Sequence, residues 1–285
     1  MNSIRNYQRG AMVLTHRIIV LLCIMDLCVI ISKKDAGKYC SLHPFVMKRT
    51  AKCLKVNIMD ITFKDVSFCY NDRVIIKDFN YYIPSGKVIA LLGPSGCGKS
   101  TLLKILLGLL ELSKGQILFN GEKISTKFKV AAHISESKLF PWMTLEKNLK
   151  TVGNTKEVNR CLKELQMEEW ADYYPSAISV GMTQKIQIAR FSLLPADLWL
   201  LDEPFNGLDA HSKEIVQRFL QAHRENKTTI IVTHNLQEAT SFADRVLLWN
   251  REKHCPDHEW ENAGQDDTLL KYMLRESLGM EGLEC

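Results

Sequence analysis

The sequence lacks the patterns that mark several special classes of protein. Its nine cysteines contain no C-x-x-C pair and are scattered along 285 residues, a distribution that argues against a zinc site or a disulfide framework and suits a reducing compartment. It contains no internal repeat and no low-complexity segment. Because 46% of the residues are hydrophobic, an ordinary fraction for a globular protein, the chain can bury a sizeable core.

Hydrophobic runs of membrane-spanning length are also missing. The run from Ile18 to Ile31 is apolar except for Asp26, and a helix of this length would span about 21 Å of a hydrocarbon core about 30 Å thick. Arg5, Arg9 and Arg17 precede this run as they would in a signal peptide, but no small-residue cleavage site follows it. We therefore expect no spanning helix, while a leader or a weak membrane anchor stays open.

Excess basic charge is confined to the N-terminal part of the chain. Residues 1–58 hold ten of the 37 Lys/Arg and two of the 32 Asp/Glu, a net charge of +8, which leaves 27 basic and 30 acidic residues, a net charge of −3, in the remainder. The main body therefore has no charge excess that would favour nucleic acid. An alternating strand pattern begins at Met59, so we expect residues 1–58 to be a mis-assigned start, a leader or a weak membrane anchor rather than a domain.

A glycine-rich motif is the strongest chemical signal. Gly93–Thr101 fits G-x-x-x-x-G-K-[ST], in which backbone N–H groups surround a nucleotide's phosphates, and Lys99 adds a positive charge. The apolar run Val88–Leu92 precedes it as a buried strand would, and a leucine-rich helix follows as far as Leu110. A glycine-rich surface loop is the alternative. We expect the phosphates to contact Gly93, Ser95, Gly96, Gly98, Lys99, Ser100 and Thr101, with the Ser100 hydroxyl on Mg²⁺.

Two further motifs follow apolar strands. Leu198–Leu201 ends in the adjacent acids Asp202 and Glu203, which suit metal binding and activation of water, although one acid there could be a helix cap. We expect Asp202 to hold Mg²⁺ and Glu203 to accept a proton. The run Thr229–Val232 brings His234 to the same sheet edge, where a phosphate contact competes with a structural role.

The remaining pattern predicts an α/β fold. Ile61–Tyr70 and Val74–Ile83 read as antiparallel strands, and Gln116–Phe119 as a short strand. Apolar spacing within Thr144–Trp170 predicts a small helical insert, and a helix is expected over His211–Ala222. Strands that alternate with helices indicate a mainly parallel sheet with helices on both faces.

The C-terminal part gives weaker signals. After Asn250 the chain turns polar and shows no strand pattern, so we expect residues 251–285 to form a tail with a final helix capped by Asp267. His254, Cys255 and His258 share a short polar stretch, and we assign no metal to them.

Together these motifs resemble those of the ATP-binding cassette (ABC) family over Met59 to about Asn250. The resemblance implies a P-loop NTPase cassette with a mainly parallel core, an antiparallel β subdomain and a helical subdomain at about 136–190, binding ATP and Mg²⁺. The matching segments look like the family's Walker A loop (Gly93–Thr101), signature (Ile178–Gln184), Walker B strand (Leu198–Glu203), D-loop (Asn206–Asp209), switch histidine (His234) and adenine-stacking aromatic (Tyr70).

The resemblance also implies partners. Family members pair head to tail, so Ser179 and Gly181 of a second copy would complete the ATP site, with Asp209 of the D-loop close to it. Leu139–Leu145 is similar to cassettes of nitrate, sulfonate and taurine importers, which implies a permease docking near Phe140 and Trp142, a periplasmic or lipid-anchored solute-binding protein, and a peripheral place on the cytoplasmic face of the membrane. Packing of these aromatics inside the helical insert is the alternative.

Two positions depart from the family pattern. Ser135 stands where the family has a glutamine that reaches Mg²⁺ and the attacking water, and Val180 replaces the first signature glycine. We expect the chain to hydrolyse ATP for solute uptake, at a reduced rate. The alternatives are a degenerate cassette that gates a partner with little hydrolysis, and a soluble ABC protein outside transport.

Overall fold

The computed structural model describes residues 59–123, 128–134, 138–224 and 227–261, and the backbone of three short strands nearer the N-terminus. These are β1 (Ile19–Leu21), β2 (Cys23–Ile24) and β3 (Leu27–Cys28), which lie in the run considered above as a possible helix. Ser135 and the helix expected after Asp267 lie outside the described residues. None of the helices within the described ranges is long and apolar enough to cross a membrane.

The main sheet has seven strands in the order β1-β9-β10-β11-β6-β12-β13. Neighbouring strands are parallel except at the β12–β13 edge, which is antiparallel. Every residue of β6, β10 and β11 is buried, as expected where helices cover both faces of a parallel sheet. The strands are β6 (Val88–Leu92), β9 (Lys129–His133), β10 (Leu198–Asp202), β11 (Thr228–Thr233), β12 (Arg245–Asn250) and β13 (Cys255–Glu261).

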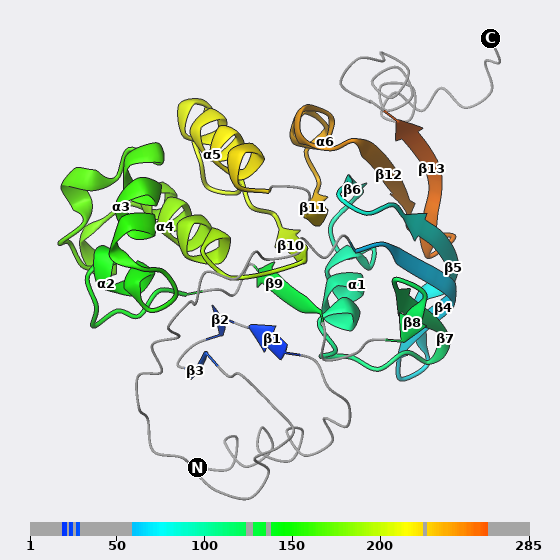
Figure 1. The fold of residues 1–285 in the computed structure, drawn as a ribbon. Coiled ribbons are helices and arrows are strands. Elements are labelled where there is room, and N and C mark those ends of the chain that lie inside the picture. Colours follow the sequence, from blue (N-terminus) through cyan, green and yellow to red (C-terminus); the bar gives the residue numbers. More distant parts are fainter. Residues whose placement is uncertain are drawn as a thin grey trace, which may run out of the picture.

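A second, antiparallel sheet has the order β5-β4-β7-β8. Its long strands β4 (Ile61–Tyr70) and β5 (Arg73–Ile83) confirm the predicted hairpin, and they bury alternate side chains against the main body. The shorter strands β7 (Lys114–Phe119) and β8 (Glu122–Lys123) complete it. Figure 1 shows this sheet on the opposite side of the main sheet from helices α2 (Leu145–Lys150), α3 (Thr155–Glu164) and α4 (Val180–Ser192).

Five of the six α-helices in the described residues begin at a side-chain cap. Asn154 and Glu157 form a reciprocal capping box at the start of Thr155–Glu164, and Thr144, Ser179, Asp209 and Asn235 each accept a hydrogen bond at the start of the helix that follows. The helix Lys99–Leu106 follows Gly98 without such a cap. The α-helices are α1 (Lys99–Leu106), α2 (Leu145–Lys150), α3 (Thr155–Glu164), α4 (Val180–Ser192), α5 (Ala210–His223) and α6 (Leu236–Phe242), with 3₁₀ turns η2 (Glu168–Trp170) and η3 (Pro175–Ala177).

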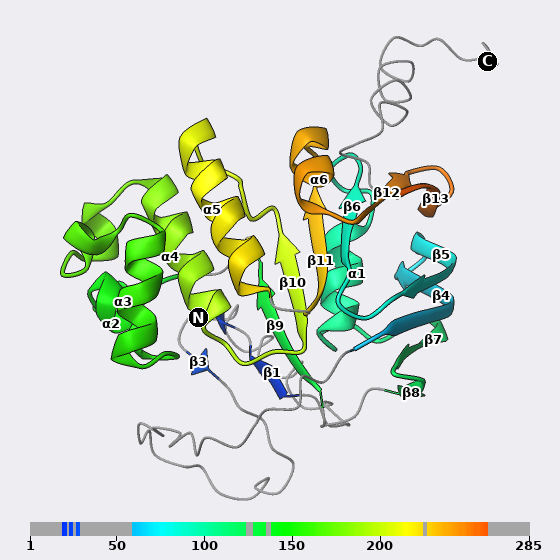
Figure 2. The ribbon, with the colours of Figure 1, turned by 45° about the horizontal axis from the view of Figure 1, so that its top comes forward.

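Two hydrophobic clusters cover the two faces of the main sheet. Alternate strand residues point in opposite directions, so Ala90 joins a cluster with α2 to α6 while Ile89 joins one with α1 and the antiparallel sheet. Figure 2 shows β6, β11, β10 and β9 side by side between these two groups of elements. The central strands are therefore held from both faces, and the loops at their carboxyl ends stand on a rigid support.

Two local predictions are wrong. The leucine-rich helix α1 ends at Leu106 rather than near Leu110, because Gly108 adopts a left-handed φ of 68° and the chain turns, leaving Leu109 40% exposed. The polar stretch after Asn250 does form a strand, β13, which pairs antiparallel with β12. Its residues are half-buried or exposed, so it lacks the hydrophobic run that marks the inner strands.

Candidate nucleotide-binding site

The predicted motifs meet at one edge of the main sheet. β6, β10 and β11 are parallel neighbours or next neighbours, and their carboxyl ends lead into the glycine-rich loop, the acidic pair and His234. A cavity of about 390 Å³ opens at this edge. Its lining is Tyr70, Arg73, Ile75, Ser95, Gly96, Gly98, Lys99, Ser100, Thr101, Asp202, Glu203 and Val232. Nine of these twelve residues are ones that the sequence singled out; Arg73, Ile75 and Val232 are not.

The glycine-rich loop needs its glycines for two different reasons. Gly96 has a φ of 78° and Gly98 a φ of 122°, in the region that side-chain-bearing residues rarely adopt. A Cβ on Gly98 would also lie 3.0 Å from the carbonyl oxygen of Ile75 and 3.1 Å from Cζ2 of Trp249. Gly96 is therefore required by backbone conformation alone, and Gly98 by both conformation and close packing.

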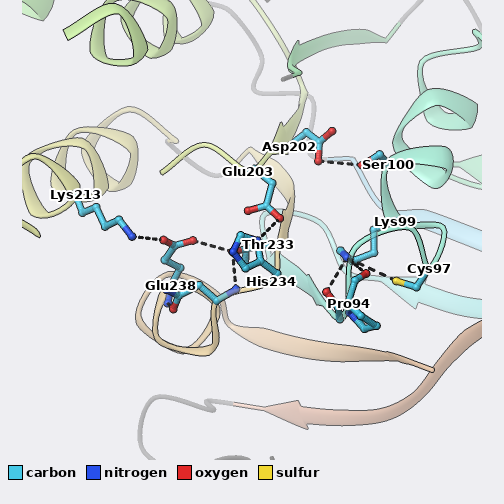
Figure 3. Close-up of polar contacts among 12 residues, drawn as sticks. Pro94, Cys97, Lys99, Ser100, Asp202, Glu203, Lys213, Thr233, His234 and Glu238 are labelled. Atoms are coloured by element: carbon cyan, nitrogen blue, oxygen red, sulfur yellow. Dashed lines mark hydrogen bonds and ion pairs between the residues drawn. The ribbon is translucent and has the colours of Figure 1, made fainter. Parts of the chain in front are cut away.

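Lys99 begins helix α1 and is only 5% exposed. Its Nζ donates to the carbonyl oxygens of Gly93 and Pro94, both at 2.8 Å, and to the Cys97 sulfur at 3.6 Å (Figure 3). These contacts hold the ammonium group inside the loop while it lines the cavity. Gly93 itself does not line the cavity but serves as an acceptor for Lys99.

The oxygen atoms expected to hold Mg²⁺ lie close together. Ser100 Oγ donates to Asp202 Oδ1 at 3.2 Å, joining the start of α1 to the end of β10 (Figure 3). A hydroxyl and a carboxylate are hard oxygen ligands, and Mg²⁺ commonly takes one or two such protein ligands and completes its shell with water and phosphate. Both residues line the open cavity, so this donor pair fits the ion.

Glu203 and His234 are paired across neighbouring strands. His234 Nδ1 lies 2.8 Å from Glu203 Oε1, and the imidazole is the more exposed of the two side chains, at 60% against 20% (Figure 3). His234 does not line the cavity directly, but Glu203 does. Thr233 anchors the turn before His234, because its hydroxyl donates to Glu238 at 2.7 Å and accepts from the Asn235 N–H.

The mouth of the cavity has an aromatic wall. Tyr70 ends β4, is 45% exposed, and meets the Phe68 ring edge to face with the centroids 4.8 Å apart. Arg73 opens β5 just across the turn and also lines the cavity. The sequence did not identify Arg73 as a site residue, because a single arginine beside a turn belongs to no motif. Its position three residues after Tyr70 is the one feature that could have indicated that it lines the same cavity.

Ser179, Gly181 and Asp209 do not line this cavity. Ser179 caps α4 by accepting from the Met182 N–H at 3.2 Å, so Gly181 is the second residue of the helix rather than a residue ahead of it. Val180 is the first helical residue and 76% exposed, so its β-branched side chain causes no backbone strain.

Asp209 caps α5 and is exposed. The Ser212 N–H and hydroxyl both donate to its carboxylate at 2.9 Å, and these hydrogen bonds, the N–H first, lower the pKa of Asp209. The described structure therefore explains Asp209 as a helix cap, while any role at a nucleotide would require a second chain.

The aromatic loop lies on the helical side of the molecule. Trp142 is 60% exposed, whereas Phe140 is half-buried under the Arg190 guanidinium, whose carbon is 5.4 Å from the ring centroid. Asn148 is fully buried and fixes the loop by accepting from the Phe140 N–H at 2.7 Å and donating to the Phe140 and Met143 carbonyls. The loop is thus rigid, with Trp142 turned outward.

Comparisons with known proteins agree with this geometry. Residues 76–206 match the family model described as ABC transporter. The aliphatic sulfonates import ATP-binding protein SsuB of Bacillus cereus is 34% identical over 203 residues, covering 67% of this chain and 81% of that protein. The sulfate/thiosulfate import ATP-binding protein CysA of Escherichia coli is 35% identical over 225 residues, covering 71% of this chain and 62% of that protein.

A solved structure shares the fold. It is a dimeric ATP-binding cassette in a post-hydrolysis state, bound to ADP and phosphate, with a TM-score of 0.62 and 24% identity, covering 71% of this chain and 98% of that one. At this identity the likeness shows the α/β cassette fold alone. The predicted fold class is confirmed.

Proposed function

Because the chain belongs to the ABC transporter family, we propose that it is the ATP-binding and ATP-hydrolysing subunit of an importer, which energises solute uptake through a separate permease. The observation that carries the proposal is the meeting of Lys99, Ser100, Asp202 and Glu203 around one cavity at the carboxyl ends of parallel strands. The relatives named for import of sulfonates and of sulfate or thiosulfate favour a small oxyanionic solute.

ATP binding follows from the lining of the cavity. The loop's N–H groups and the amino end of α1 attract the phosphates, and the Lys99 ammonium exchanges its carbonyl contacts for phosphate oxygens. At the mouth, the Tyr70 ring offers a face for the adenine. The nucleotide thus spans from the antiparallel sheet to the edge of the main sheet.

Ser100 and Asp202 are the residues that would hold Mg²⁺. When bound, the ion neutralises charge on the phosphate oxygens. The hydrogen bond between Ser100 at the start of α1 and Asp202 at the end of β10 keeps the two oxygen ligands together beside the phosphates.

Hydrolysis requires a base beside the γ-phosphate. The Glu203 carboxylate orients the attacking water and accepts its proton as the oxygen bonds to phosphorus and the bond to the leaving ADP oxygen breaks. His234 holds that carboxylate through Nδ1, which leaves Nε2 to contact the phosphoryl group. Water orientation by Glu203 and charge neutralisation by Lys99 together lower the barrier.

A second copy of the chain completes the site. Val180 and Gly181 begin a 13-residue helix, α4, and the first N–H groups of such a helix stabilise an anion. Because Ser179 and Gly181 lie away from their own chain's cavity, they contact the nucleotide of the partner in a head-to-tail pair.

The permease docks at the aromatic loop, where Trp142 supplies an exposed anchor on a rigid base. The subunit then sits peripherally on the cytoplasmic face of the membrane, and a solute-binding protein acts on the far side. We place the start of the cassette at Met59 and its helical insert at about 136–190, and β13, which pairs with β12, extends the cassette to Glu261.

A steady-state ATPase assay tests the proposal. The purified chain should hydrolyse Mg-ATP, and Glu203→Gln should bind ATP but not turn it over. A wild-type chain that binds ATP without turnover would support instead a cassette that gates a partner, the reading that the signature valine Val180 and Ser135 favour.

A further inference from the structure

The half-buried side chain of Gln184 joins three segments of the cassette. The amide nitrogen of Gln184, on α4, donates to the Pro204 carbonyl at 2.8 Å and lies 3.1 Å from His133 Nε2 at the end of β9. An amide nitrogen can only donate, so His133 Nε2 accepts and carries no proton. Both N–H bonds of the amide are thereby used, and its orientation is fixed.

The environment of His133 keeps it an acceptor. The side chain is 2% exposed, and the Phe191 ring stands edge-on at 6.3 Å between centroids. Burial, followed by the nearby positive charge of Arg190, lowers the pKa of His133 to about 4. The imidazole is therefore neutral at physiological pH.

Pro204 follows directly on a strained residue. Glu203 has a φ of 49°, in the left-handed region, although a residue before proline favours extended backbone. Neighbouring hydrogen bonds hold this conformation: the Glu203 N–H donates to the Val232 carbonyl at 2.9 Å, and the Glu203 carbonyl accepts from the Asn206 N–H at 3.1 Å. The Gln184–Pro204 bond fixes the other side of the same turn.

Helix α4 touches this turn at a second point. A Cβ on Gly181 would lie 3.3 Å from the Gly207 carbonyl oxygen, and a Cβ on Gly207 would lie 3.3 Å from Val180 Cγ1. The amino end of α4, which includes the signature residues, therefore packs directly against the backbone that follows Glu203.

We propose that His133 is a positioning residue: by accepting from Gln184 it fixes the amide that holds Pro204, and so sets the place of the Glu203 carboxylate. The proposal rests on the proposed function, in which Ser179 and Gly181 at the amino end of α4 contact ATP on the second copy. The link from α4 to Glu203 then connects the two ATP sites of the dimer within one chain.

Two substitutions of His133 distinguish its role as a hydrogen-bond acceptor from its role in filling space. His133→Leu keeps a side chain of similar size without an acceptor, whereas the amide oxygen of His133→Gln can accept where Nε2 does. We expect His133→Leu to lower kcat about tenfold, the effect of losing one buried hydrogen bond, with the Kd for ATP within about twofold of wild type and a Hill coefficient reduced towards 1. His133→Gln should keep kcat within about twofold.

An unchanged kcat in His133→Leu, an equal loss in both variants, or a loss confined to ATP affinity would overturn the proposal. If His133→Leu does not fold, Gln184→Met, which removes the two donors from the other partner, should give the same selective loss of kcat. If the wild type itself hydrolyses no ATP, the proposed function fails. In that case ¹⁵N NMR of His133 tests separately whether its Nε2 accepts the hydrogen bond from Gln184. A proton on Nδ1 supports it, and a proton on Nε2 contradicts it.

Discussion

His234 Nδ1 lies 2.8 Å from Glu203 Oε1, and this contact joins the ends of two neighbouring buried strands. The carboxylate is mostly shielded while the imidazole is mostly exposed, so the pair presents its acid towards the cavity and its histidine towards solvent. A base held in this way is prepared to act on a water beside the phosphates.

Glu203→Gln should lower the rate of ATP hydrolysis by about 10²–10⁴-fold, because the amide cannot accept the proton of the attacking water. The Kd for ATP, measured by calorimetry, should stay within a few-fold of wild type. Glu214→Gln, an exposed residue on α5, is the matched control and should keep the wild-type rate. More than a tenth of the wild-type rate in Glu203→Gln would show that another group activates the water.

Tyr70→Ala should weaken ATP binding about tenfold, because stacking of an aromatic ring on adenine contributes about 1–3 kcal/mol. Tyr70→Phe keeps the ring and should bind as wild type does. Tyr82 is similarly exposed, at 51%, but does not line the cavity, so Tyr82→Ala serves as the control. Fluorescence titration with a nucleotide analogue gives the Kd values. Equal increases in Kd for Tyr70→Ala and Tyr82→Ala would contradict stacking of the adenine on Tyr70.

The free energy of unfolding should decrease as the pH drops from about 6.5 to 4. The pKa of His133 is about 4 in the folded protein against an ordinary 6.5, so the unfolded chain takes up a proton in this window that the native protein does not. Acid therefore favours unfolding, by up to about 3 kcal/mol from this group. Urea unfolding of wild type and His133→Gln at several pH values isolates the effect, and identical pH dependence of the two proteins would contradict it.

Trp142→Ala should weaken association with the permease at least tenfold while ATP hydrolysis by the separate chain stays unchanged, because truncation removes an exposed anchor and leaves the Asn148 contacts in place. Leu109→Ala, at an exposed leucine next to α1, is the control. Co-purification with the permease gives the comparison, and equal retention of both variants would place the docking surface elsewhere.

The sequence could predict what depends on local pattern. The glycine-rich loop, the acidic end of β10 and the hairpin of β4 and β5 each carry their signal in consecutive residues, and the parallel strands bring their ends together at one edge. The link between His133 and Gln184 could not be found in this way, because the two residues lie 51 positions apart and meet only through the packing of α4 on the sheet.

The strand β13 and the conformation of Val180 also differed from what the sequence suggested, for two different reasons. The strand β13 is polar because it is an edge strand, half-buried at most, so its pairing with β12 leaves no hydrophobic run to read. Val180 looked like a misfit because a glycine was expected, but as the first residue of α4 it has ordinary helical backbone and an exposed side chain.

In a head-to-tail pair, ATP on the glycine-rich loop of one copy should be covered by the amino end of α4 of the other copy. Sedimentation velocity of Glu203→Gln tests it directly, with Mg-ATP, with ADP and without nucleotide. We expect a dimer only with Mg-ATP. Adding Val180→Glu, which suits the start of a helix but repels phosphate, should return the protein to monomers. A monomer with Mg-ATP, or a dimer that forms without nucleotide and tolerates Val180→Glu, would contradict it.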